Sequence, residues 1–198
     1  MSQMSPDSLV DRIVRASQWR GASQPGRDWS TVESVLGTAL PSDYKLLMSR
    51  FPSGTYRDII WVANPIDART DLGEFARREV EEVLGVIGHE EMTYLDGTSY
   101  RLFPEEGGLL PWGDDGQGGW FCWITSSADP DQWRVTYYDD GMDEWRERDG
   151  PVSRIIWEVM TRDDDNIMHW DLGDRPAVFR VPSTYAGDGE WIPHPEYE

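Results

Sequence analysis

Carboxylates concentrate in two short stretches of this sequence, and their spacing is the first indication of its chemistry. The stretches are LLPWGDDGQGGWFCW (109–123) and YYDDGMDEW (137–145), each of which combines acids with tryptophan and turn-forming glycine. Acids beside aromatics are compatible with glycoside cleavage, with binding of a hard cation, or with attraction of a basic protein. The carboxylates concerned are Asp114, Asp115, Asp139, Asp140, Asp143 and Glu144.

The motifs of catalysis and of metal or phosphate binding are not found. The sequence has no G-x-S-x-G nucleophile motif, and its three histidines, His89, His169 and His194, lie in polar or terminal segments. The acidic stretches do not match the calcium-loop pattern D-x-[DN]-x-[DN]-G, and GDDGQGG lacks the lysine of a phosphate loop. We therefore predict no catalytic residue, no metal and no cofactor. A sugar-cleaving enzyme is kept as a further alternative because acids stand beside aromatics, but among 37 acidic residues carboxylate pairs also arise by chance, so they carry almost no signal.

The charge of the chain selects the kind of partner. There are 37 acidic and 18 basic residues, giving a formal net charge of -19. The acidity is regional, since residues 1–51 carry five acids and six bases whereas residues 105–149 carry twelve acids and three bases. Such a surface repels nucleic acids and anionic membranes and attracts a basic protein. We predict a basic protein partner, no nucleic acid and no membrane.

The hydrophobic patterns predict one α+β domain with a central antiparallel sheet flanked by N-terminal and C-terminal helices. Helical spacing occurs near 5–16, 29–36, 42–51, 71–87 and 151–162, and short aromatic strands lie between them, including GWFCWIT as a central strand and WRVTYY as an alternating one. Residues 1–28 are predicted to be a helix and linker. Residues 183–198 are predicted to be a loosely held acidic tail rich in proline and glycine.

Location and oxidation state are also expectations from composition. No run approaches 18 apolar residues, and no basic segment followed by an apolar one begins the chain, so neither a membrane helix nor a secretory signal is predicted. Cys122 is the only cysteine and is predicted to be a buried core residue. We expect a cytoplasmic protein, whose oligomeric state the sequence leaves open.

Two blocks of the sequence resemble the SUKH superfamily, the Smi/Knr-like group. WSTVESVLGTALPSDYKLLMSRFPSG (29–54) is similar to the opening pattern of that family, and LFPEEGGLLPWGDDGQGGWFCWIT (102–125) is similar to its later pattern. The resemblance implies a Smi/Knr-like domain over residues 29–182. It also implies a binding protein without enzymatic activity, either a bacterial immunity protein that neutralises a toxin or a regulator of cell-wall assembly.

The glycine-rich stretch is then predicted to be a β-hairpin turn, with Gly116, Gly118 and Gly119 supplying backbone freedom. Gly119 occupies a position where the family pattern has an acid. Trp120 and Trp123 are expected in the core. Asp114, Asp115 and Gln117 are expected to point outward. As residues that bind a cognate basic toxin we predict the acids as contributors and two tryptophans as anchors: Trp112, Asp114, Asp115, Gln117, Asp139, Asp140, Asp143, Glu144 and Trp145.

Overall fold

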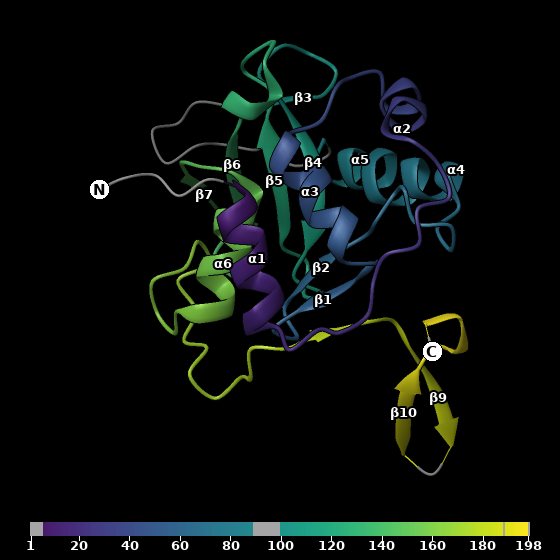
Figure 1. Cartoon of the computed structure of the whole chain (residues 1–198). Helices are drawn as coiled ribbons and strands as arrows, with labels where there is room; N and C mark the ends of the chain where they lie inside the picture. The colour runs from purple at the N-terminus through teal and green to yellow at the C-terminus, as the bar shows by residue number, and fades with distance from the viewer. Residues whose placement is uncertain (1–5, 89–99, 188, 198) are drawn as a thin grey trace.

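A computed structural model describes residues 6–88, 100–187 and 189–197. Its centre is an eight-stranded sheet with helices on both faces, and a separate two-stranded hairpin stands apart from it near the C-terminus (Figure 1). The strand order is β7-β6-β5-β4-β2-β1-β8, and β3 pairs with β4 off this path. The strands are β1 (Gly54–Tyr56), β2 (Ile60–Val62), β3 (Arg101–Leu102), β4 (Gly108–Asp114), β5 (Trp120–Ile124), β6 (Arg134–Asp139), β7 (Glu144–Arg148) and β8 (Phe179–Arg180).

The prediction of a central antiparallel sheet is confirmed: among the described residues, every pair of neighbouring strands in the sheet is antiparallel except β3–β4, which is parallel. β5 lies between β4 and β6 and is buried on both faces, as its continuous apolar sequence predicts. The alternation in β6 also holds. Val135 and Tyr137 contribute to the larger core on one face, whereas Tyr138 joins Cys122 in a second core on the other.

Three helices pack together over the larger core: α1 (Pro6–Ala16), α3 (Ser42–Arg50) and α6 (Val152–Thr161) (Figure 1). Their inward residues Ile13, Leu47 and Ile155 are completely buried. α1 therefore shares the core of the domain although it precedes the expected boundary at residue 29. The division at residues 28 and 182 remains a proposal.

Two residues of the LPSDY segment, Asp43 and Tyr44, make contacts that hold α3 in the fold. Asp43 is buried, and its Oδ2 accepts a hydrogen bond of 2.7 Å from the backbone N–H of Ser153 in the first turn of α6. This carboxylate acts as the N-terminal cap that α6 lacks in its own sequence, because Pro151 provides none. Tyr44 beside it is buried and donates to the carbonyl of Ala63. The segment therefore joins α3 to α6 and to the sheet.

The helix predicted over 71–87 is continuous but changes its winding. It comprises α4 (Leu72–Phe75), the π-helix η1 (Ala76–Glu82) and α5 (Val83–Ile87). Ile87 packs with Leu109 and Cys122 on the second face of the sheet. The predicted helix over 29–36 is α2 (Trp29–Leu36), capped by Asp28 at its start and by Gly37 at a φ of 76° at its end. No helix among the described residues is long and apolar enough to cross a membrane.

Several elements were not predicted from the sequence patterns, including the short strand β1. EWRER forms the edge strand β7, which hydrophobic alternation does not reveal because Trp145 is its only apolar residue. The predicted tail over 183–198 contains regular structure: β9 (Ser183–Gly187) and β10 (Glu190–Pro193) form a hairpin, followed by the 3-10 turn η3 (Pro195–Tyr197). A second 3-10 turn, η2 (Pro130–Gln132), precedes β6.

Candidate functional site: an acidic cleft at the hairpin end of the sheet

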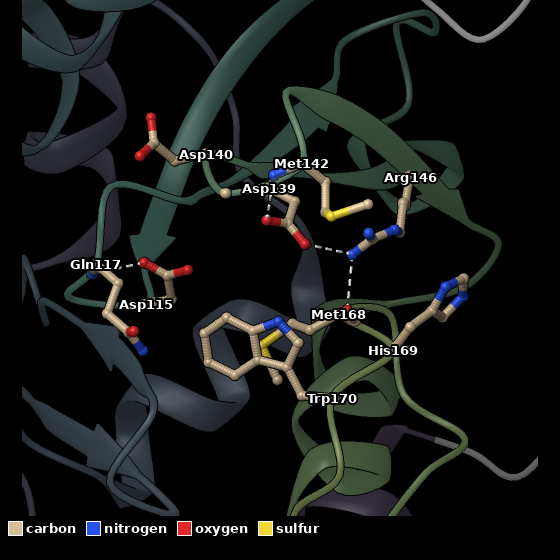
Figure 2. Close-up of a pocket in the computed structure, with 10 residues that line it drawn as sticks. Asp115, Gln117, Asp139, Asp140, Met142, Arg146, Met168, His169 and Trp170 are labelled. Carbon is tan, nitrogen blue, oxygen red and sulfur yellow. Dashed lines mark hydrogen bonds and ion pairs between the residues drawn. The ribbon is translucent and has the colours of Figure 1, made fainter.

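A cleft of about 570 Å³ lies where the β4–β5 turn and the β6–β7 turn meet the segment that follows α6 (Figure 2). Both turns lie at the same end of the sheet because β4, β5, β6 and β7 are successive antiparallel neighbours. The cleft brings together three segments of the chain, residues 115–117, 139–146 and 168–170. It is lined by Asp115, Gln117, Asp139, Asp140, Gly141, Met142, Arg146, Met168, His169 and Trp170.

Asp115 supports the first turn from inside. Its side chain is 7% exposed, and its oxygens accept hydrogen bonds from the hydroxyl of Tyr137 at 2.7 Å and from the backbone N–H groups of Gln117 at 2.7 Å and Gly119 at 2.9 Å. The expectation that Asp115 points outward is wrong, because the tyrosine that buries it comes from a strand 22 residues later. Its role is to hold the turn, which leaves little of its charge for a partner.

Gly119 is required by the same arrangement. A Cβ atom at this position would lie 2.4 Å from Oδ2 of Asp115 and 2.7 Å from the backbone oxygen of Tyr138. Gly116 and Gly118 do adopt positive φ values of 68° and 102°, as predicted for the turn, whereas Gly119 is needed for close approach. Glycine thus replaces the acid of the family pattern at position 119, where the structure has no room for a side chain.

Arg146 ties the three walls of the cleft together. Its Nη1 donates to Oδ2 of Asp139 at 2.8 Å and to the backbone oxygen of Met168 at 2.7 Å, and its Nε donates to Glu144 at 2.7 Å (Figure 2). Asp139 is only 7% exposed. The charges of Asp139 and Glu144 are therefore offset within the protein, and both acids position the β6–β7 turn.

Three of the predicted residues stay available at the surface. Asp140 and Gln117 are exposed on the rim of the cleft, and within the described residues the carboxylate of Asp140 has no hydrogen bond or ion pair. Asp143 is exposed and accepts a hydrogen bond of 2.8 Å from Tyr138. Met142 lies between these two acids in sequence and is 67% exposed. The rim thus presents free negative charge beside an adaptable apolar side chain.

The third wall, residues 166–170, was not predicted from the sequence. Asn166 is fully buried and shapes it: its Nδ2 donates to the backbone oxygen of Trp170 at 2.8 Å, and its Oδ1 accepts from the N–H groups of Met168 and Trp170. Trp170 is half-buried, so one side of the indole faces the cleft (Figure 2). The sequence DDDNIMHW gives little indication of this wall, because Asn166 stands among polar residues and nothing in the sequence shows that it is buried.

Arg57 fixes this wall from beneath. It is 4% exposed, and its guanidinium donates to the backbone oxygens of Val159, Arg162, Leu172 and Arg175 and to Oδ1 of Asp163 at 2.8 Å. Two of these carbonyls belong to the last turn of α6, whose carbonyls have no partner within the helix. Arg57 therefore joins the β1–β2 turn to both sides of the segment that carries Trp170.

The two predicted tryptophan anchors lie in the core. Trp112 is 5% exposed and packs against Phe121 at a ring-centroid distance of 5.1 Å. Trp145 is 4% exposed and packs against Tyr138 at 5.2 Å. The expectation that these rings are displayed to a partner is wrong, because strand pairing turns both into the interior. Trp123 is buried and Trp120 half-buried, in agreement with their expected core positions.

Asp114 faces a different surface. It pairs in register with Trp61 of β2, outside the cleft. Burial raises the pKa of Asp114. A hydrogen bond from the backbone N–H of Gly116 lowers this pKa, and the charge of Asp115 raises it, so that the net direction is upward. The pKa of Glu79 on η1 is raised by burial and then by the charge of Asp114. Asp114 therefore contributes no charge to the rim of the cleft.

The cleft can hold a cationic or amphipathic side chain, because the two turns contribute carboxylates and Met142, and the segment after α6 contributes Met168 and Trp170 (Figure 2). Within the described residues, no group of three or more histidine, cysteine, aspartate or glutamate side chains is arranged to hold a metal ion. His169 lies at the cleft and His194 near the C-terminus, whereas His89 lies outside the described residues. Burial raises the pKa of the Cys122 thiol, which lies in the second core.

The α+β fold places the cleft on two hairpin turns at one end of the sheet, and such a fold does not by itself assign a chemistry. A family model described as SMI1-KNR4 cell-wall (SUKH_6) matches residues 27–149, which is more than half of the chain. The chain belongs to this family, and the predicted Smi/Knr-like fold is confirmed. No curated protein and no solved structure matches the chain significantly.

Proposed function

We propose that this chain is a cytoplasmic immunity-type protein of bacterial origin that neutralises a cognate toxin domain by binding it in a stoichiometric complex. The toxin domain is basic, of the nuclease-like kind, and its active site is occluded without any catalytic step. Family membership supports a binding role, and the charge of -19 supports a basic partner.

One observation carries the proposal: the cleft is preorganised, and at its rim the carboxylate of Asp140 has no hydrogen bond or ion pair within the described residues, with exposed Asp143 on the same turn. Asp115 and Asp139 hold the turns of the cleft through their hydrogen bonds. The negative charges of Asp140 and Asp143 are not needed for this and can interact with a partner. Turns fixed in this way lose little conformational entropy when a partner binds. Asp140, Asp143, Gln117, Met142 and Trp170 are the residues that we assign to the partner interface.

A second candidate function is a regulatory scaffold that binds a cellular protein of the wall-assembly type. The family description, which names the cell wall, favours it. The same cleft would serve both roles, and the two proposals differ only in the partner. An enzyme acting on sugars is not proposed, because two of the three carboxylates that line the cleft, Asp115 and Asp139, are committed to holding its turns and to Arg146.

The test is a capture experiment from lysate of the native organism with the purified protein, at low and at high salt, with bound proteins identified by mass spectrometry. Immunity predicts a basic toxin domain that is released as salt rises and whose toxicity the chain suppresses when the two are co-expressed. A wall-synthesis or signalling protein that stays bound at all salt concentrations would replace immunity with the scaffold role.

The charge dependence is tested by the double variant Asp140→Asn/Asp143→Asn. Asparagine tolerates the positive φ of 51° at Asp143 and still accepts the hydrogen bond from Tyr138. The matched control is Glu105→Gln/Glu106→Gln, which removes the same charge from two exposed acids just before β4, at the opposite end of that strand from its turn. Loss of capture by both variants equally would show that only net charge matters.

A further inference from the structure

The β9–β10 hairpin lies outside the residues matched by the family and apart from the main sheet (Figure 1). Arg69 holds it at its base: the guanidinium lies 4.1 Å from the ring of Tyr197, and Nη1 donates to the backbone oxygen of Glu196 at 3.2 Å. No third strand within the described residues pairs with either strand of this hairpin. The hairpin is thus fixed at one end while both of its outer edges are open.

One face of the hairpin carries two large exposed rings. Tyr185 and Trp191 are register partners, their ring centroids lie 5.5 Å apart, and they are 56% and 66% exposed. Thr184 and Ile192 occupy the other face and are partly buried. A cross-strand aromatic pair stabilises a hairpin. It leaves more than half of each ring in water, however, which is the usual condition of an aromatic contact site before its partner binds.

The charge around these rings selects the partner. Residues 181–198 contain four acids, of which Glu190 and Glu196 are exposed, and no lysine or arginine. A second copy of this chain would place two acidic hairpins against each other, which like-charge repulsion disfavours. An arginine or lysine side chain, by contrast, is attracted both to the carboxylates and to the faces of the two rings.

The edge that can accept another strand is β9. β10 ends in Pro193, which has no N–H group to donate. β9 contains no proline. The register shift between Glu190 and Trp191 places an extra residue, Ala186, near the end of β9, and the preceding residues 183–185 pair in regular register. We propose that the open edge of β9 binds an extended, arginine- or lysine-bearing segment of a protein partner as an added strand, with its cationic side chains against Tyr185 and Trp191. This site is separate from the cleft and does not depend on the immunity role.

The test uses three synthetic peptides and isotope-labelled full-length protein, followed by NMR at about 0.15 M salt, where the Debye length is about 8 Å. The first peptide alternates arginine and threonine over seven residues. The second has proline in place of threonine and so cannot form a strand ladder, and the third has glutamate in place of arginine. We expect shifts in the backbone amides of β9 and in the indole N–H of Trp191 with the first peptide only.

Variants locate the contact. Trp191→Tyr keeps an aromatic pair with Tyr185 but has a weaker π face, and it should weaken binding of the first peptide about two- to fivefold. Trp170→Tyr in the cleft is the matched control and should leave that binding unchanged. Binding of the proline peptide with equal affinity would overturn the strand addition. Chemical shift changes confined to residues of the cleft would overturn the proposed site. A dimer that forms with rising protein concentration and that none of the peptides dissociates would also overturn it.

Discussion

Replacing Arg57 by methionine tests how the cleft wall is held. Methionine has a similar length but no donor, so four backbone oxygens of residues 159–175 lose the hydrogen bonds that Arg57 donates to them. Both side chains experience the same unfavourable φ of 54° at this position, so backbone strain cancels from the comparison. The change in stability therefore reports the hydrogen bonds themselves.

The expected magnitude follows from burial. A hydrogen bond to a charged group contributes about 1.5–3 kcal/mol, and removing one partner from a buried charged network costs about 3–5 kcal/mol in total because the bonds are not additive. We expect Arg57→Met to lower the free energy of unfolding by about 3–5 kcal/mol. The ion pair with Asp163 is a minor part, since that side chain is 65% exposed, and Asp163→Asn should cost less than about 1 kcal/mol.

Urea unfolding followed by circular dichroism measures both variants. Arg57→Lys adds a graded comparison, because an ammonium group keeps the charge but cannot reach all the carbonyls, and it should fall between Met and the native residue. NMR of the Trp170 indole would show whether the wall moves. Equal, small losses for Arg57→Met and Asp163→Asn would refute the account of Arg57 as the residue that fixes this segment.

Three further variants or probes test local parts of the structure. Gly119→Ala forces a Cβ atom against Asp115 and should lower the free energy of unfolding by about 1–3 kcal/mol, whereas Gly85→Ala, whose Cβ meets nothing within 4 Å in α5, should raise it by about 0.5–1 kcal/mol; thermal melts compare them. Asp114 has a raised pKa in the folded state, so the folded protein binds its proton more tightly and loses stability as pH rises above the ordinary carboxyl range. Asp114→Asn should therefore raise the free energy of unfolding at pH 7, but not at a pH low enough to protonate the native acid. Urea titrations at several pH values would measure this difference. Cys122 should react with a thiol reagent only as fast as the protein opens, and rapid reaction in native buffer would contradict its burial.

Residues whose environment is set by local sequence were predictable. The periodicity of α3 and α6, the αL cap at Gly37 and the two-faced β6 follow from spacing alone, and the structure agrees. The hairpin of Tyr185 and Trp191 was not predictable in this way, because glycine, proline and acid dominate its composition. A strand with a single apolar residue, such as β7, likewise becomes visible only through its pairing with β6.

The candidate site was predicted at the level of loops but not of individual side chains. Both acidic turns do meet, since successive antiparallel strands place alternate turns at one end of the sheet. Which acid is free depends on distant partners: Tyr137 buries Asp115, and Arg146 occupies Asp139. Reversing the charge of Asp139 would therefore disrupt the turn and would not report on binding. No sequence pattern assigns such pairings in advance.

In the proposed complex, the carboxylates of Asp140 and Asp143 at the rim of the cleft attract a basic partner. The most direct measurement is the association rate of the captured partner with native protein, with Asp140→Asn/Asp143→Asn and with Glu105→Gln/Glu106→Gln, each over a range of salt concentrations. We expect Asp140→Asn/Asp143→Asn to associate several-fold more slowly than the native protein, with a shallower salt dependence. The association rate of Glu105→Gln/Glu106→Gln should stay close to that of the native protein. Identical rates and salt slopes for both variants would contradict this expectation and remove the cleft from the binding surface.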